Sequence, residues 1–176
     1  MAILIVTLLC LGFVTLTIIV IKNQLAKSYE YTVTEQFNTP AENLWEIITN
    51  YENQLMWRNS LIKIEKVINK KGSDIWKETD IKGQQIEWES FIEIRNKKLV
   101  RKTVNENIAV NLIHTYELKP FGEVSLLTLT ETTQVENVLY RWIQYIFTSA
   151  TSELGQYIKD LRMKINNDMA NRTNNV

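Results

Sequence analysis

The chain has 176 residues, 20 basic and 20 acidic side chains, one histidine and one cysteine. Zero formal net charge argues against nucleic acid as a partner, because phosphate binding needs a basic surplus or a basic patch. A lone cysteine excludes an internal disulfide, and a lone histidine excludes a metal centre built from several histidines. We therefore expect neither a metal nor another cofactor.

The N-terminal segment is strongly apolar. Residues 2–21 carry no charge and are dominated by Ile, Leu and Val. Twenty helical residues span about 30 Å, the thickness of the hydrocarbon core of a bilayer. The run lacks both the preceding basic residue and the following small-residue cleavage site of a signal peptide. We predict a transmembrane anchor at residues 1–22. Because Lys22 and Lys27 follow it, the protein is expected to be a single-pass membrane protein with a cytoplasmic C-terminal domain.

A short polar linker, residues 23–28, precedes the first element of that domain. Alternating apolar residues over 29–37 predict a strand. The next four residues, Thr39-Pro40-Ala41-Glu42, are typical of a helix start, with Thr39 and Glu42 forming a capping box. This helix is expected to end near Asn50, and residues 51–59 are expected to form a second short helical or irregular piece.

From Ser60 onward the apolar period changes to two, which indicates strands. Turn residues such as Gly72, Gly83 and Gly122 separate the segments. Short strands at this spacing predict an antiparallel meander. Six strands are expected, at residues 60–68, 74–81, 85–94, 98–104, 110–118 and 124–131.

The last regular element is expected to be a long helix over residues 138–165. Apolar residues recur every three or four positions, which places them on one stripe of a helix of about 28 residues, roughly 42 Å long. The polar residues 166–176 are expected to be a disordered tail. The element order, a strand, two helices, six strands and a long helix, predicts an α+β domain over residues 29–165.

Several motifs of this domain resemble the START/Bet v 1-like (SRPBCC) superfamily. The run from Thr39 to Trp57, the stretch from Thr115 to Gly122 and the pattern Gly155, Tyr157-Ile158 carry the resemblance. Its polyketide cyclase/dehydrase and lipid-transport group is the most similar. The resemblance implies a helix-grip fold, in which a curved seven-stranded sheet surrounds the C-terminal helix and leaves a cavity. Members bind lipids or other apolar small molecules, and a minority are cyclases, but no shared catalytic motif is present to transfer.

Strand parity predicts which side chains would line such a cavity. In 110–118 one face carries Leu112, His114 and Tyr116, and in 85–94 one face carries Trp88 and Ile92. His114 and Tyr116 would then be polar groups that orient a ligand, or core residues with satisfied hydrogen bonds. Most of the acidic residues of the predicted strands are expected on a solvated outer face: Glu78, Glu87, Glu89, Glu93 and Glu117. The candidate ligand-binding residues are Trp57, Trp76, Trp88, Ile92, Leu112, His114, Tyr116, Ile146 and Ala150.

These patterns predict a membrane-anchored domain that binds or transports a lipid or another apolar small molecule in an internal cavity. Two alternatives stay open. One is a cyclase- or dehydrase-like enzyme acting on an apolar substrate, in which turnover would show a pH profile that depends on His114. The other is an interaction module whose core is filled and which binds no ligand. No catalytic residue is predicted from the sequence.

Overall fold

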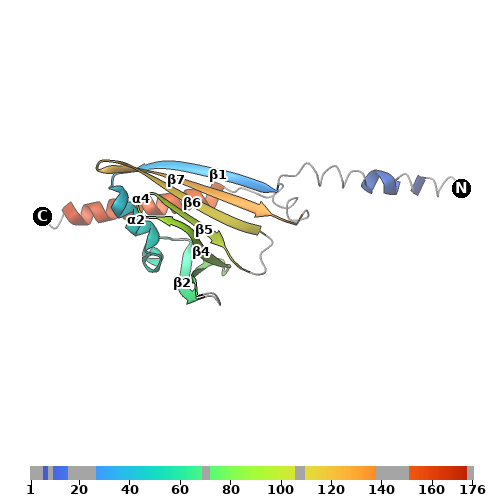
Figure 1. Cartoon of the computed structure of the whole chain (residues 1–176), viewed down its shortest axis with the longest axis horizontal. Coiled ribbons are helices and arrows are strands. Elements are labelled where there is room, and N and C mark those ends of the chain that lie inside the picture. The colour runs from blue at the N-terminus through green and yellow to red at the C-terminus, as the bar shows by residue number, and fades with distance from the viewer. Residues whose placement is uncertain are drawn as a thin grey trace.

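The computed structural model describes residues 6–7, 10–15, 27–68, 72–105, 110–137 and 151–173. Its strands and helices follow the predicted order (Figure 1). The elements are β1 (Ser28–Phe37), α2 (Ala41–Thr49), the short 3-10 helix η1 (Glu52–Met56), β2 (Leu61–Ile68), β3 (Asp74–Asp80), β4 (Gln85–Ile94), β5 (Lys98–Thr103), β6 (Val110–Phe121), β7 (Val124–Val135) and α4 (Thr151–Thr173).

The seven strands form one antiparallel sheet in the order β1-β7-β6-β5-β4-β3-β2. The strands from β2 to β7 are neighbours in the chain and in the sheet, as a meander requires. β1 is the exception, because it lies at the opposite edge of the sheet from β2, the next strand in the chain. It pairs with β7 along its whole length, from Ser28 opposite Gln134 to Phe37 opposite Ser125. The predicted seven-stranded antiparallel sheet is confirmed.

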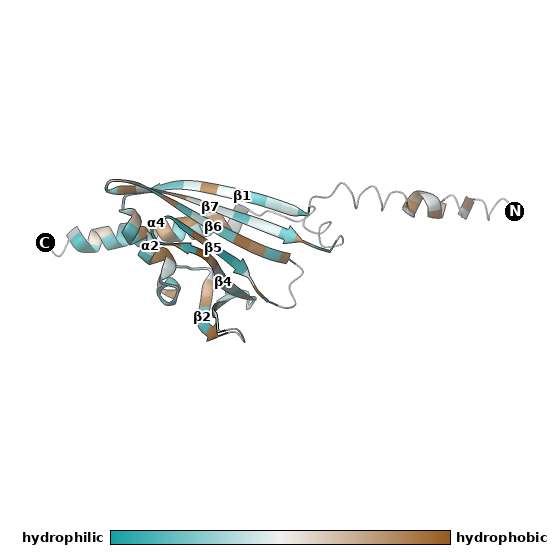
Figure 2. Cartoon of the chain, viewed as in Figure 1, coloured by the Kyte–Doolittle hydropathy of each residue, from teal (hydrophilic) through white to brown (hydrophobic). Residues whose placement is uncertain are grey.

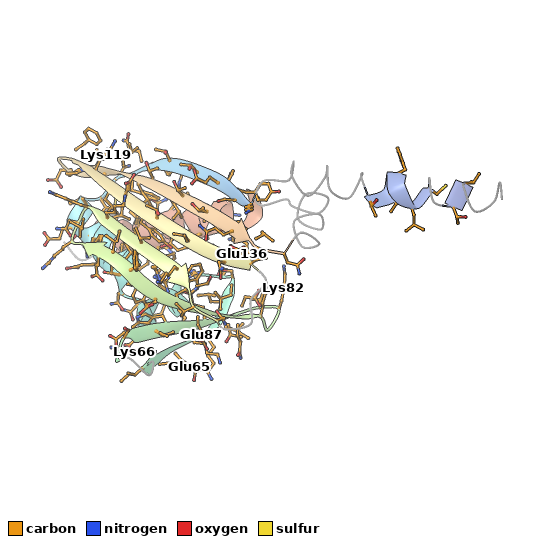
Figure 3. The ribbon with its side chains drawn as sticks, turned by 45° about the vertical axis from the view of Figure 1, so that its right-hand side comes forward. Glu65, Lys66, Lys82, Glu87, Lys119 and Glu136 are labelled. Atoms are coloured by element: carbon orange, nitrogen blue, oxygen red, sulfur yellow. The ribbon has the colours of Figure 1, made fainter. Side chains whose placement is uncertain are left out.

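Both helices lie on the same face of this sheet (Figures 1 and 3). We call it the inner face. The apolar stripe of α2, with Leu44 and Ile48, meets the stripe of α4, with Leu161, over the inner face. The core is closed by strand residues that point toward both helices. These are Phe37, Leu99, Tyr116, Leu118, Leu127 and Leu129.

The edge strand β2 is protected by charge. Lys63 pairs with Glu65 at 2.8 Å, and Lys66 pairs with Asp74 of β3 at 2.7 Å. Glu65 and Lys66 project from this edge of the domain (Figure 3). Charged side chains on an exposed edge disfavour pairing with the strand of another chain.

The start of α2 differs from the prediction. Pro40 occupies the N-cap position, and no side chain caps the helix, so the predicted capping box is wrong. Thr39 is nearly buried, and its carbonyl oxygen accepts a hydrogen bond of 2.8 Å from the hydroxyl of Ser125 in β7. A contact with a distant strand therefore replaces the local cap at this helix start.

The C-terminal helix extends beyond the predicted end at Ile165. Helix α4 continues to Thr173, so the tail predicted to be disordered is helical as far as that residue. Two contacts explain the extension. Lys164 and Asp168 form an ion pair of 2.7 Å one turn apart, and Met169 packs against the core. The N-terminal part of the predicted long helix, residues 138–150, lies outside the described residues.

The predicted membrane location is corrected by the structure. Most of the predicted anchor lies outside the described residues, and its described parts, 6–7 and 10–15, are helical. Within the part of the chain that the structure describes, no helix has both the length and the apolar character needed to cross a membrane. Helix α4 has 23 residues, but hydrophilic residues occur along its length (Figure 2). A spanning helix needs about 20 predominantly apolar residues in succession.

Candidate functional site

A buried cluster of charged groups lies on the inner face of the sheet. Glu78 of β3 accepts hydrogen bonds from two arginines, Arg58 after η1 and Arg101 of β5. Each carboxylate oxygen binds one guanidinium at 3.0 Å. The exposed fractions of the side chains are only 14% for Arg58, 7% for Glu78 and 2% for Arg101. We call these three residues the arginine cluster.

Aromatic rings surround the arginine cluster. The guanidinium carbon of Arg101 lies 4.4 Å from the ring centre of Tyr51 and 5.2 Å from that of Trp88. The guanidinium carbon of Arg58 lies 5.2 Å from the ring centre of Tyr157 in α4. Stacking on ring faces suits the planar, weakly hydrated guanidinium group, so these contacts favour arginine over lysine.

Burial and charge act in opposite directions on the pKa values of the cluster. Burial by itself would raise the pKa of Glu78, but the two guanidinium groups outweigh it and hold that pKa below its ordinary value. Burial would likewise lower the pKa of Arg101, and the carboxylate of Glu78 raises it instead. Glu78 and Arg101 are therefore charged at neutral pH.

Hydrogen bonds fix the position of Arg58. Its Nη1 also donates to the side-chain oxygen of Gln54 at 2.8 Å. The side chain of Gln54 is fully buried, and its Nε2 donates to the backbone carbonyl of Ile48 at 2.7 Å. The next residue, Asn59, donates to the buried carboxylate of Asp160 in α4 from its backbone and from its side chain, both at 2.9 Å. The segment that carries Arg58 is thus attached to both α2 and α4.

A histidine–glutamate pair lies beside the cluster. His114 of β6 and Glu131 of β7 are directly opposite in the sheet, and Nε2 of the histidine is 2.9 Å from Oε2 of the glutamate. The imidazole ring lies against Trp88, with ring centres 4.5 Å apart. The exposed fractions are 16% for His114 and 12% for Glu131, so both are largely removed from solvent. Where the carboxylate is ionised it only accepts hydrogen bonds, and Nε2 is then the donor.

Aromatic contacts continue from His114 across the inner face to α4. Tyr116 lies 6.3 Å from His114 and 5.9 Å from Tyr157, and Tyr157 lies 5.5 Å from Trp57, measured between ring centres. Burial raises the pKa of Tyr116, and it raises the pKa of Tyr157 well above its ordinary value. Both hydroxyl groups therefore keep their protons and can donate a hydrogen bond.

Several buried polar atoms of this region have no hydrogen-bond partner among the described residues. They are Nε of Arg58 and of Arg101, Nε1 of Trp88 and the hydroxyl oxygen of Tyr157. Each of these atoms carries a hydrogen that it can donate. A buried donor without a partner costs free energy, about 1–3 kcal/mol for a neutral group. All four donors belong to residues in the arginine cluster or in contact with it, so each can donate to an acceptor group there.

An open cleft of about 510 Å³ lies next to the cluster, beyond Tyr51. Tyr51 and Trp76 form its aromatic wall, with ring centres 4.9 Å apart. The hydroxyl of Tyr51 is 3.1 Å from that of Ser90, which also lines the cleft. The remaining lining is largely polar or acidic and consists of Thr49, Gly72, Ser73, Asp74, Glu89 and Glu93. This cleft therefore lacks the apolar walls expected of a lipid cavity.

The structure brings together four of the nine predicted ligand-binding residues. Trp57, Trp88, His114 and Tyr116 belong to the continuous aromatic contacts of the inner face. Leu112 lies on the same face and is half-buried. Trp76 lines the open cleft instead.

The other three predicted site residues are Ile92, Ile146 and Ala150. Ile92 is placed wrongly by the prediction, because Phe91 is an extra residue between two strand pairs, Ser90 with Arg101 and Ile92 with Val100. Such a bulge shifts the alternation by one, so Ile92 joins Val100 on the outer face and is 38% exposed. Ile146 and Ala150 lie outside the described residues.

Sequence reasoning missed the arginine cluster, Tyr157 and Glu131. Glu78 was expected on the solvated outer face, and this expectation is wrong because its side chain is 7% exposed. Strand parity contains the missing signal, since Glu78 is two residues from Trp76, which was expected to point inward. No group of three or more potential metal ligands occurs within the described residues.

Neither a family model nor a curated protein sequence matches the chain. Its structure is similar to several solved structures. Norcoclaurine synthase from Thalictrum flavum, a point mutant in complex with a transition-state analogue, is 10% identical, with a TM-score of 0.63 over 81% of this chain and 96% of that chain. A START superfamily protein from Mycobacterium smegmatis is 14% identical, with a TM-score of 0.61 over 78% and 97% of the two chains.

The di-domain ARO/CYC BexL from the BE-7585A biosynthetic pathway is 8% identical, with a TM-score of 0.62 over 82% of this chain and 52% of that chain. These similarities agree with the curved seven-stranded sheet and its C-terminal helix. The resemblance seen in the sequence is confirmed at the level of the fold, because the chain has a helix-grip fold similar to those of these solved structures.

Proposed function

We propose that this domain binds a small, largely apolar molecule against the inner face of its sheet. The supporting observation is the unequal burial of that face. Tyr116 and Leu118 of β6 are buried in the core, whereas Leu112 and His114 of the same strand and face are only half-buried. One end of the inner face is therefore filled by α2 and α4, and the other end offers apolar and aromatic side chains to a ligand.

The chemistry of that end suits such a ligand. Small-molecule sites combine apolar and aromatic walls with a few polar groups that set the orientation of the ligand. Trp88 and Leu112 would supply the wall, and His114 a polar group. The norcoclaurine synthase structure holds a transition-state analogue, so a similar fold accommodates a small molecule.

A neutral apolar fluorophore tests this proposal. The methyl ester of 11-(dansylamino)undecanoic acid is expected to bind the chain with enhanced, blue-shifted emission. Replacing Leu112 by glutamine should weaken binding about tenfold, because the change removes apolar contact surface from the site and adds an amide that must be desolvated. Affinity is measured by fluorescence titration.

Ile113→Gln is the matched control, since Ile113 is the next residue of β6, is also half-buried and points to the opposite face. Equal losses in both variants would contradict a site on the inner face. Absence of probe binding by the unsubstituted chain would contradict the proposed function itself.

Acid–base catalysis on such a molecule is a second candidate, favoured by the geometry of His114 and Glu131. A histidine whose one nitrogen is held by a carboxylate has its other nitrogen available as a general base. Here Nε2 binds Glu131 at 2.9 Å, which leaves the lone pair on Nδ1.

The tautomer of His114 is directly measurable, because the chain has only one histidine and hence one set of imidazole signals. Nitrogen NMR is expected to show that the neutral form of the ring carries its proton on Nε2. Glu131→Gln should shift the ring toward a mixture of tautomers. A proton on Nδ1 in the unsubstituted chain would leave no base on the ligand side and would contradict this candidate.

A further inference from the structure

We infer that the ligand carries one carboxylate group, which the arginine cluster and its aromatic neighbours bind. This inference deepens the proposed function and rests on it. It concerns the chemical class of the ligand, an acidic molecule with an apolar body, and it assigns the acidic end to the buried side of the inner face.

The arginine cluster has more positive than negative groups. Two guanidinium groups contact one carboxylate in the cluster, so these three residues together carry one net positive charge. Asp160, another buried carboxylate, accepts hydrogen bonds from the neutral side chains of Asn59 and Gln156 and forms no ion pair with either arginine among the described residues. Removing charged groups from water is costly, and a bound group of opposite charge lowers that cost. The two guanidinium groups therefore favour an anionic group of the ligand over a cationic one.

The cluster and its aromatic neighbours also contain hydrogen-bond donors without a partner among the described residues. Arg101 uses Nη2 on Glu78, while its Nε has no partner within the described part of the chain. Nε1 of Trp88, whose ring lies on the same guanidinium, is also without one, and both residues are at least 97% buried. A carboxylate has two acceptor oxygens with about four lone-pair sites. It can therefore accept from several such donors at once.

The surroundings of these donors are aromatic and largely buried. The donors lie among the rings of Tyr51, Trp88 and Tyr157, where water does not screen their charge. The hydroxyl of Tyr157 is buried, protonated and without a partner among the described residues. From this region the inner face leads to the half-buried Leu112, so an acidic group and an apolar body would each meet matching chemistry.

The test compares 11-(dansylamino)undecanoic acid with its methyl ester, which differ only in the carboxylate. The unsubstituted chain is expected to bind the acid at least tenfold more tightly than the ester at neutral pH. Trp88→Phe and Tyr157→Phe each remove one donor and keep an aromatic ring. Tyr157→Phe should weaken binding of the acid about tenfold and change binding of the ester less than twofold. Trp88→Phe also reduces the apolar wall of the site, so it should weaken binding of both probes, and binding of the acid about tenfold more than binding of the ester.

Trp57→Phe is the control, because Trp57 is a buried tryptophan that contacts the Tyr157 ring, outside the arginine cluster. It should affect the acid and the ester equally. Ester binding in each variant also reports that the fold is intact. Equal affinity for acid and ester would overturn the carboxylate inference while leaving the proposed function in place, and binding of neither probe would overturn both. A preference for the acid that both Phe variants retain would overturn the assignment to this cluster.

Discussion

Replacing Glu78 by glutamine is expected to lower the free energy of unfolding by about 3–5 kcal/mol, because it leaves two buried guanidinium groups without their carboxylate. The exposed fraction of the Arg101 side chain is only 2%, so solvent cannot replace the lost partner. The free energy is obtained from urea unfolding followed by circular dichroism.

Glu117→Gln is the matched control. Glu117 also binds a basic residue, Lys98, at 2.8 Å, but the side chains are 46% and 37% exposed. An exposed ion pair contributes about 0–1 kcal/mol, so this substitution should have a small effect. Similar losses in the two variants would contradict a buried cluster at Glu78.

The same residue predicts how stability depends on acidity. The pKa of Glu78 is lower in the folded chain than the value of about 4.3 for an unfolded glutamate. Between these two pKa values the unfolded state therefore binds more protons than the folded state. The contribution of ionised Glu78 to the free energy of unfolding is complete above the unfolded pKa, and it is lost as the pH falls through the lower folded pKa. In Glu78→Gln this part of the acid-dependent loss should disappear, and an unchanged acid profile would contradict it.

Leu161→Ala is expected to cost about 2–5 kcal/mol, because it leaves a cavity where α4 packs against the inner face. Leu161 has no exposed surface, and it belongs to the same core as Leu44 of α2 and Leu129 of β7. Thermal or urea unfolding measures the loss. Its size depends on how far α2 and the sheet can relax into the space.

Met163→Ala, two residues along the same helix, is the control. Met163 is 41% exposed, and its truncation should change stability by no more than about 0.5 kcal/mol. A loss at Met163 as large as that at Leu161 would mean that the helix packs through a different stripe.

Local patterns in the chain were enough to predict the strands and the antiparallel meander. Alternation of apolar and polar residues predicted seven strands, and the turn glycines divided them; Gly122 has the positive φ of 66° that its hairpin requires. The alternation of side chains along each strand also predicted correctly that Tyr116 and Trp88 point inward, because successive side chains of a strand lie on opposite faces of the sheet.

Helix ends and exceptions to parity depended on contacts between distant segments. No local rule predicts that Ser125 would bond the carbonyl of Thr39, or that Phe91 would be an extra residue that turns Ile92 outward. Both features depend on which strand or segment lies opposite. The spacing of apolar residues within one segment does not show which segment that will be.

The candidate site depended on tertiary structure even more strongly. A charged residue in a strand is usually exposed, so Glu78 alone predicts an outer position. It can be buried only because Arg58 and Arg101, 20 positions before it and 23 after it, reach it from two other elements. The cost of burying each charge is offset only when all three meet, and that balance exists only in the assembled fold.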